Sequence, residues 1–278
     1  MSTAIHKVAE IASARGASAV FKRLTFIAEA EPGLRQLREY RNPRNCIAIE
    51  EDFDANATIS EKSELLLAMI PTEAAAETKK VRDTWMSSGD VGPITFTACG
   101  LKIEWRPGRA IVQGPPAGFD AAAKALADFT FYEGELRALE REIESREPQA
   151  QLDASYALRI RHRDRKHWQR FAELIEHFYR MRLSYARLEP QLTIPSSDLP
   201  RDAKQLMTRL CEEANVEDRL EAFSNRLEAC EDLYEGATDR IAEYKWYFGG
   251  QWLEITIVGL LVLEVVLLGF DMYLRHFK

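Results

Sequence analysis

The chain has 278 residues, of which 46% are hydrophobic and 29% charged, and its formal net charge is -7. This composition is that of a folded protein and excludes global disorder, while the acidic balance argues against non-specific nucleic-acid binding by the whole molecule. The four cysteines form no C-x-x-C pair, so we expect reduced thiols in a cytosolic domain rather than disulfides or a zinc site. These cysteines are Cys46, Cys99, Cys211 and Cys230.

The first 118 residues carry short segments that are typical of strands. AVFKRLTFIAE and NCIAIEE are strand-like, and ITFTACGLKIEW and RAIVQG predict paired strands joined by Arg-Pro-Gly. Between them, TISEKSELLLAMI opens with a capping box from Thr58 to Glu61, which predicts a helix running to about Trp85. We therefore predict a small α/β domain with a mostly antiparallel sheet over 1–118, ending at the turn-rich sequence GPPAGFD.

Residues 119–248 show helical periodicity and predict a helical hairpin followed by a long stalk helix. The first helix runs from about Asp120 to Arg146 and is expected to break at Pro148, and the second runs from about Leu152 to Leu188. Each carries an aromatic stripe that is typical of a core. These stripes comprise Phe129, Tyr132, Leu136, Leu139 and Ile143, then Trp168, Phe171, Ile175, Phe178 and Tyr185.

The stalk helix is predicted from about Arg201 to Phe248, after which Gly249-Gly250 is expected to interrupt it. Its apolar residues recur at steps of three and four over four heptads, as in a coiled coil. This seam either joins copies of the chain or packs inside its own subunit, and the sequence leaves both alternatives open. The seam residues are Leu220, Phe223, Leu227, Cys230, Tyr234, Ala237, Ile241, Tyr244 and Phe248.

The last apolar stretch predicts one transmembrane helix at 251–274, which completes an α+β fold. Between Leu253 and Phe270, thirteen of eighteen residues are Leu, Ile, Val or Phe, which favours insertion by at most roughly 4–8 kcal/mol. The carboxylate of Glu264 opposes insertion by roughly 2.5–3.5 kcal/mol, so insertion still wins. Trp252 and Tyr273 stand where interfacial aromatic residues are expected. The alternative is a buried core helix.

The position of this segment predicts a tail-anchored protein with its N-terminal bulk in the cytosol. The N-terminal sequence has no signal peptide, and no earlier segment is apolar enough to cross a membrane. The flanking cations nearly balance, so the positive-inside rule decides little. Glu264 shares a helical stripe with Leu260, Leu261, Leu268 and Asp271, and we expect it to lie either in a helix–helix seam or beside a small wet cavity.

Three stretches together resemble the "required for meiotic nuclear division" family. ITFTACGLKIEW resembles the family's signature, which is an aromatic strand, a glycine and a hydrophobic strand ending in tryptophan. Its matching residues are Phe96, Gly100 and Trp105. EDRLEAFSNRLEACEDLYEGATDRIAEYK resembles the family's long helix through Asn225, Leu227 and Cys230. WLEITIVGLLVLEVV resembles its terminal span, with matching residues Leu253, Glu254, Glu264 and Val265, although Ile255 stands where the family has tryptophan.

The resemblance implies an α/β head, a helical stalk and a C-terminal anchor, without an established catalytic site. One branch of the family lies on the mitochondrial inner membrane, forms large homomeric complexes and supports organellar translation. If Glu264 matches a family position, we expect it to specify helix association, as a buried polar residue fixes register. We also count Glu254 and the seam residues among those that serve oligomerisation or the anchor.

One sharply basic patch could bind the phosphates of RNA or a ribosome, or anionic lipid headgroups. The alternative is a solvated helix face that pairs with acidic residues elsewhere. The patch consists of Arg159, Arg161, Arg163, Arg165, Lys166 and Arg170.

No nucleotide-binding loop, nucleophile elbow or zinc motif occurs in the sequence, so we predict neither catalysis nor a cofactor, metal or small-molecule substrate. The leading hypothesis is a non-enzymatic, membrane-anchored, homo-oligomeric scaffold or adaptor, linked to translation or membrane organisation as the resemblance implies. One alternative is a relative of CorA-type channels, although those have two spans and a Gly-Met-Asn loop. Another is a ligand sensor that signals through Gly249-Gly250.

Overall fold

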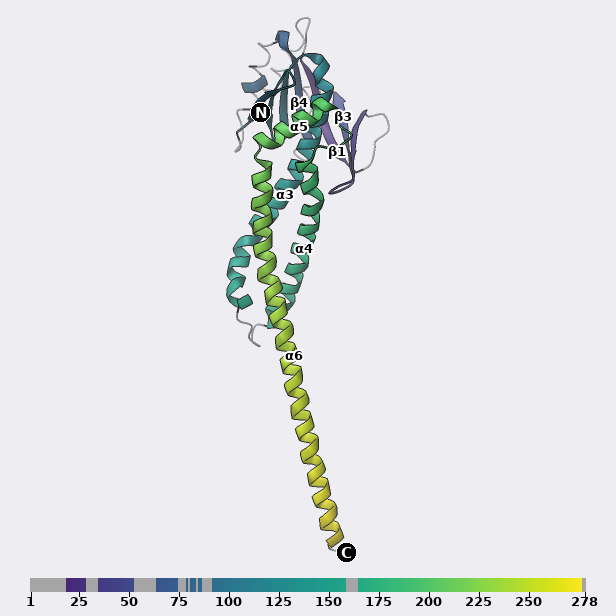
Figure 1. Cartoon of the computed structure of the whole chain (residues 1–278), viewed down its shortest axis with the longest axis vertical. Helices are drawn as coiled ribbons and strands as arrows, with labels where there is room; N and C mark the ends of the chain where they lie inside the picture. The colour runs from purple at the N-terminus through teal and green to yellow at the C-terminus, as the bar shows by residue number, and fades with distance from the viewer. Residues whose placement is uncertain are drawn as a thin grey trace. The chain divides into compact units, whose positions relative to one another are not determined.

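The computed structural model describes residues 19–28, 35–52, 64–74, 79, 81–83, 85–86, 92–158 and 165–276. A sheet rich in antiparallel pairs comes first, and helices follow, ending in a long apolar helix (Figure 1). The predicted α+β class is therefore confirmed.

The chain forms two compact units, whose borders fall inside helices. Unit 1 comprises Met1–Glu144 and Met181–Arg226, and unit 2 comprises Ser145–Arg180 and Leu227–Lys278. The change from strands to helices nevertheless lies at Phe119, next to the predicted border at residue 118.

Unit 1 contains one seven-stranded sheet with the order β2-β3-β1-β4-β7-β6-β5. All neighbouring strands are antiparallel except β4 and β7, which pair in parallel. The strands predicted on either side of the Arg-Pro-Gly turn are confirmed as β6 and β7. The strands are β1 Val20–Ile27, β2 Arg35–Tyr40, β3 Cys46–Asp52, β4 Glu64–Pro71, β5 Ile94–Ala98, β6 Leu101–Arg106 and β7 Arg109–Gly114.

The helix predicted across SELLLAMI is wrong, because residues Glu64–Pro71 form the central strand β4. Every residue from Leu65 to Ile70 is buried, so this strand shows neither the alternation of a half-exposed strand nor a polar face. On one face, Leu66, Ala68 and Ile70 pack in a cluster with Val81, Trp85, Met86 and Ile111. The proposed capping box, Thr58 to Glu61, lies outside the described residues.

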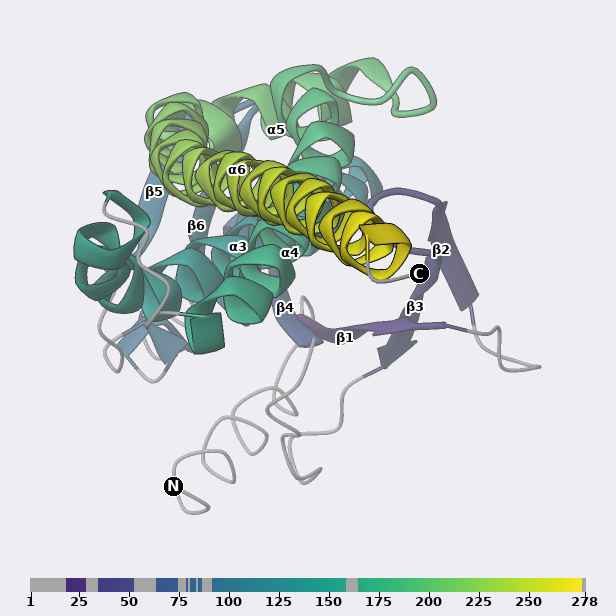
Figure 2. The same cartoon turned by 90° about the horizontal axis from the view of Figure 1, so that it is seen from below.

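The N-terminal part of helix α3, Phe119–Leu158, lies on the sheet (Figure 2). It supplies aromatic side chains to the core there. The Phe129 ring meets the Trp105 ring of β6 edge-on at 4.8 Å between centroids, and the Phe131 ring stacks on Tyr40 of β2 at 4.3 Å. The Trp105 indole also donates a hydrogen bond to Thr130 Oγ1 at 3.1 Å. Of the predicted stripe, Phe129, Tyr132, Leu136 and Ile143 are buried, whereas Leu139 is half-buried.

The helix break predicted at Pro148 is wrong, since α3 continues through this residue to Leu158. Proline removes one backbone donor and costs a helix roughly 3 kcal/mol. Tertiary contacts beyond it hold the last turns in place: Asp153 is buried among polar partners, and the Ala157 carbonyl accepts a hydrogen bond from Arg240 Nη1 at 2.9 Å. Helix α4 then begins at Arg165 and ends at Thr193, later than predicted.

The predicted stalk consists of two helices, α5 at Arg201–Glu213 and α6 at Val216–His276. They part at Asn215, whose φ of 49° lies in the left-handed region that asparagine tolerates. The interruption predicted at Gly249-Gly250 is wrong, because α6 runs through both glycines as one helix (Figure 1).

Gly114 at the end of β7 generates a test of the fold. A Cβ at this position would lie 2.9 Å from the Gly100 carbonyl oxygen, and its φ of 155° is unfavourable for other residues. We expect Gly114→Ala to lower the free energy of unfolding by about 2–3 kcal/mol, measured by denaturant titration in mild detergent.

The matched control is Gly118→Ala, whose added Cβ meets only the flexible Leu101 side chain at 3.0 Å. Equal losses for the two variants would contradict the role assigned to the backbone at Gly114.

Candidate functional site: an exposed apolar helix and its supporting unit

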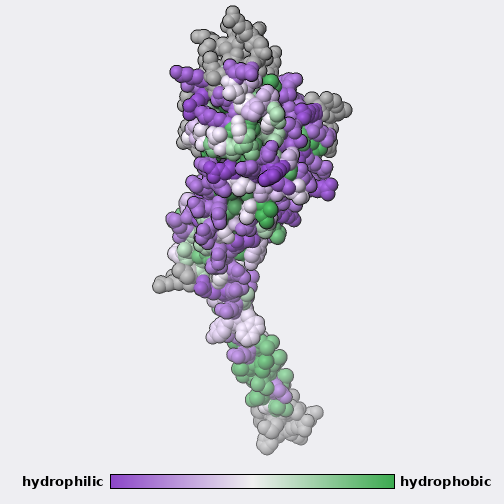
Figure 3. All heavy atoms as spheres, turned by 45° about the horizontal axis from the view of Figure 1, so that its top comes forward, coloured by the Kyte–Doolittle hydropathy of each residue, from purple (hydrophilic) through white to green (hydrophobic). Residues whose placement is uncertain are grey.

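The C-terminal part of α6 is long and apolar enough to span a membrane. An 18-residue window within it passes this test, and none of that window is buried. Its large apolar side chains are each at least half exposed, and Figure 3 shows hydrophobic side chains gathered over this end of the helix. The alternative of a buried core helix is therefore excluded for this structure.

Glu254 and Glu264 both lie on the exposed surface of this segment. At 100° per residue, their ten-residue separation points them about 80° apart around the helix axis. Neither has an ion-pair partner among the described residues. The structure therefore places these two predicted site residues on one helix without bringing them to a shared site.

The predicted seam is buried within its own chain from Leu220 to Ile241. In unit 1, the Phe223 ring lies 5.3 Å from the Tyr185 ring, and the Tyr185 hydroxyl donates a hydrogen bond to the Leu220 carbonyl at 3.3 Å. In unit 2, the Tyr234 ring stacks on Phe178 at 5.6 Å. Of the two alternatives left open by the sequence, this structure shows intramolecular packing.

A buried carboxylate joins the three helices of unit 2. The Tyr234 hydroxyl donates a hydrogen bond to Asp153 Oδ2 at 3.0 Å, the Gln149 amide donates to Asp153 Oδ1 at 3.1 Å, and Arg170 forms an ion pair with the same carboxylate. Burial and the negative charge of Asp153 raise the pKa of Tyr234 above its usual value. Every Asp153 oxygen has a donor, so this polar group specifies how the helices pack.

The structure separates Arg170 from the rest of the predicted basic patch, because its guanidinium is bound to Asp153. Arg165 and Lys166 lie in the first turn of α4, while Arg159, Arg161 and Arg163 lie outside the described residues. The ends of the connection between α3 and α4 both contact α6. Besides the Ala157–Arg240 hydrogen bond, the Trp168 ring lies 5.6 Å from the Tyr244 ring.

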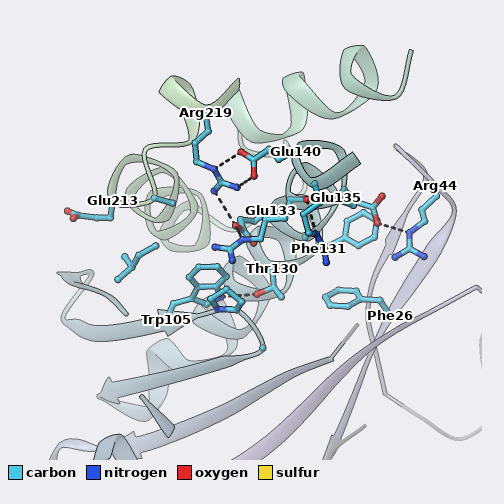
Figure 4. Close-up of a pocket in the computed structure, with 18 of the residues that line it drawn as sticks. Phe26, Arg44, Trp105, Thr130, Phe131, Glu133, Glu135, Glu140, Glu213 and Arg219 are labelled. Atoms are coloured by element: carbon cyan, nitrogen blue, oxygen red, sulfur yellow. Dashed lines mark hydrogen bonds and ion pairs between the residues drawn. The ribbon is translucent and has the colours of Figure 1, made fainter. Parts of the chain in front are cut away.

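Unit 1 has an open groove of about 970 Å³ that the sequence did not reveal (Figure 4). Aromatic side chains, including Phe26, Trp105 and Phe131, lie along one side of it. Arg219 crosses the other side: its Nε and Nη2 atoms bind both oxygens of Glu140 at 2.9 and 2.7 Å, and its Nη1 lies 3.2 Å from Glu133 Oε1.

Ion pairs compensate the remaining carboxylates of this groove. Glu133 also pairs with Arg137, and Glu135 pairs with Arg44 at 2.8 Å. The described lining residues include no histidine, cysteine, serine or lysine, and the one lining hydroxyl, Thr130 Oγ1, accepts a hydrogen bond from the Trp105 indole. The charges of the groove connect α3 to the start of α6.

Asp128 of α3 is a buried carboxylate of unit 1 that contacts the edge strand β2. It accepts a hydrogen bond from the Tyr40 hydroxyl at 2.9 Å and pairs with Arg38 at 3.0 Å. Burial raises the pKa of Asp128 to about 6, although Arg38 and Tyr40 oppose this change. Burial and the Asp128 charge raise the pKa of Tyr40 well above its usual value.

The cysteines are free thiols, and those of unit 1 are poor nucleophiles at neutral pH. Burial raises the pKa of Cys46 to about 11 and that of Cys211 to about 12, and it also raises the pKa of Cys99. Among the described residues, no three side chains of His, Cys, Asp and Glu stand close enough to hold a metal ion.

No protein-family model matches this sequence, and no curated protein is significantly similar to it. The resemblance to the "required for meiotic nuclear division" family therefore stays a prediction that rests on the quoted residues.

Substitution of Leu227 tests whether the seam packs within the chain or joins two copies of it. Because its side chain is fully buried within the chain, we expect Leu227→Ala to lower the free energy of unfolding by about 2–4 kcal/mol through the cavity it leaves. Thermal unfolding in mild detergent measures this loss, and native mass spectrometry on the same sample measures the oligomeric state.

The control is Leu267→Ala, a leucine on the exposed apolar segment, which should unfold like the wild type. A Leu227→Ala protein that dissociates without losing stability would show that the seam joins copies of the chain.

Proposed function

We propose that the chain is a non-enzymatic scaffold or adaptor protein, anchored in a membrane by residues 251–274. The observation that carries the proposal is the complete exposure of the apolar window of α6. Leaving each large apolar side chain in water forgoes about 1.5–3 kcal/mol, and soluble monomers rarely expose such a continuous apolar surface. Lipid would cover all sides of this helix at once.

The geometry of α6 supports a spanning helix. From Trp252 to Tyr273 the backbone is helical throughout, and 22 residues at 1.5 Å each extend about 33 Å. This length matches a hydrocarbon core of about 30 Å. The helix also satisfies its backbone hydrogen bonds internally, as a lipid environment requires.

We place the folded units on the cytosolic side. The sheet and helices α3, α4 and α5 all precede residue 251 in the chain, so a single crossing leaves them together on one side of the membrane. Cys46 and Cys230 are buried free thiols, and the described cysteines form no disulfide. Such thiols are typical of a reducing compartment.

Homo-oligomerisation through the span belongs to the same proposal. The seam of α6 is occupied within its own chain, whereas Glu264 and its neighbours Leu260, Leu261 and Leu268 contact nothing else in the described structure. A carboxylate within a bilayer normally faces a partner or water rather than lipid. The family resemblance, with its large homomeric complexes, supports a partner that is another copy of this chain.

We further propose anionic lipid, rather than RNA or a ribosome, as the partner of the basic patch. Two residues that flank the connection between α3 and α4 contact α6. Ala157 contacts Arg240, and Trp168 contacts Tyr244. These α6 residues precede Trp252 by only 12 and 8 positions, or about 18 and 12 Å of helix. The backbone of Arg165 and Lys166 lies in α4 three and two residues before Trp168, so this part of the patch is near that level of α6, which favours charged headgroups as its partner.

The ligand-sensor alternative invoked a hinge at Gly249-Gly250, and the backbone at these two residues gives that hinge no support. α6 is helical through both glycines.

Truncation tests the anchor. A chain ending at Gly250 lacks the exposed apolar segment, so we expect it to move from the membrane pellet to the supernatant after alkaline carbonate extraction. The control is full-length Leu260→Ala, which should stay in the pellet because one leucine contributes less than 1 kcal/mol to insertion. A truncated chain that resists extraction would contradict the proposal.

Substitution of Glu264 tests oligomerisation. We expect Glu264→Leu to shift the distribution in mild detergent toward smaller species in native mass spectrometry, because the polar contact between spans is lost. Glu254→Leu is the matched control: this residue lies near the start of the span, where a carboxylate can reach water. An unchanged distribution for Glu264→Leu would exclude its role in association.

A further inference from the structure

A ring of exposed aromatic side chains lies on α6 directly before the apolar segment. Trp246 is 83% exposed, Tyr247 61%, Phe248 39% and Trp252 67%. We call these four residues the aromatic collar. Large aromatic side chains normally contribute to cores and interfaces, so this degree of exposure requires a covering environment.

The collar surrounds the helix instead of lining one face. At 100° per residue, Trp246, Tyr247 and Phe248 point in three directions around the helix axis that are about 100° apart. Trp252 points about 40° beyond Phe248. A partner helix would cover a single stripe of about 100°. A collar with this distribution fits an environment that encloses the helix on all sides.

The length of the collar fits the headgroup layer of a bilayer. Six residues separate Trp246 from Trp252, which is about 9 Å along the helix axis. The headgroup layer of each leaflet is about 5–8 Å thick, from the difference between the whole bilayer and its hydrocarbon core. Because α6 is unbroken at Gly249-Gly250, the collar has a fixed position along the span.

The collar residues also have the chemistry of that layer. Tryptophan and tyrosine combine an apolar ring with one polar group, and both are enriched where hydrocarbon meets water. The Gln251 amide donates a hydrogen bond to the Tyr247 hydroxyl at 3.1 Å, so polar groups occur among the rings at this level.

We infer that the aromatic collar lies in the phospholipid headgroup layer, with Trp252 on its hydrocarbon side and Trp246 on its outer side. This inference rests on the proposed membrane anchor and deepens it by fixing the depth of insertion.

It follows that the packed part of unit 2, which ends at Ile241, lies against the membrane surface without an intervening linker. Ile241, the last buried seam residue, precedes Trp246 by five positions, about 8 Å of helix. Between them, the Tyr244 ring lies 5.6 Å from the Trp168 ring, and Lys245 Nζ lies 5.7 Å from the same indole. The packed end of unit 2 thus begins where the headgroups end, with the Lys245 ammonium close to lipid phosphates.

Depth-dependent fluorescence quenching tests this placement in the full-length chain. The protein is reconstituted into vesicles of phosphatidylcholine and phosphatidylglycerol that carry a spin label either on the headgroup or in the middle of the acyl chain. Of the five tryptophans, the contributions of Trp246 and Trp252 are obtained by subtracting the signals of Trp246→Phe and Trp252→Phe from the wild type. Flotation of the same vesicles shows whether the protein is inserted.

We expect the headgroup label to quench Trp246 at least about twofold more strongly than the mid-chain label, as for an interfacial residue. Trp252 should be quenched more than Trp246 by the mid-chain label, because it lies deeper. We expect the quenching of Trp246 to be the same in vesicles with and without phosphatidylglycerol, because the four collar residues carry no charge.

Two outcomes would overturn the inference while leaving the anchor intact. If the protein floats with the vesicles but Trp246 responds only to acrylamide in the water, the collar lies above the membrane. If Trp246 responds to neither acrylamide nor labelled lipid, a second copy of the chain covers it instead. Failure to float would instead contradict the anchor itself.

Discussion

The structure depends on a single backbone constraint: α6 has to satisfy two different environments without a break. Up to Ile241 it buries one stripe against α3 and α4 and exposes its other faces to water. Beyond Trp252 it is apolar on almost every side and contacts none of the rest of the described chain. The change takes place within about three turns, over which the helix carries exposed aromatic side chains and two glycines. Because the backbone hydrogen bonds of α6 continue throughout, only the side-chain composition differs between the two parts of the helix.

Polar groups determine how the helices of unit 2 are arranged. Hydrophobic stripes can slide past one another at modest cost, whereas a buried carboxylate must keep its donors. Asp153 takes its donors from α3, α4 and α6, through Gln149, Arg170 and Tyr234. The same contacts explain why α3 remains helical past Pro148. In unit 1, Arg219 has a related role between α3 and the start of α6.

The elements that were predictable from sequence are those with a clear period. The aromatic stripes, the paired strands around Pro107-Gly108 and the exposed apolar helix follow from local patterns. The β4 strand did not, because burial of both its faces removes the alternation that distinguishes a strand from a helix. The division at Asn215 has only a weak local signal, because asparagine is favoured both before a helix and in the left-handed conformation after one.

The groove could not be predicted for a different reason. Arg219 and Glu140 are 79 residues apart in sequence, and nothing local to either residue indicates the other. The intrinsic cost of proline or glycine in a helix is roughly 1–3 kcal/mol, and long-range contacts offset that cost at Pro148.

An unbroken α6 also has a rotational consequence. Since each residue turns the helix by 100°, Glu264 is locked at an azimuth about 140° from Ile241, on the side away from the subunit's own core. Any rotation of α6 about its axis at Ile241 turns Glu264 by the same angle. One extra residue inserted near Gly249 would therefore rotate the part of α6 that follows it by about 100° relative to the part before it. The composition of the helix would hardly change.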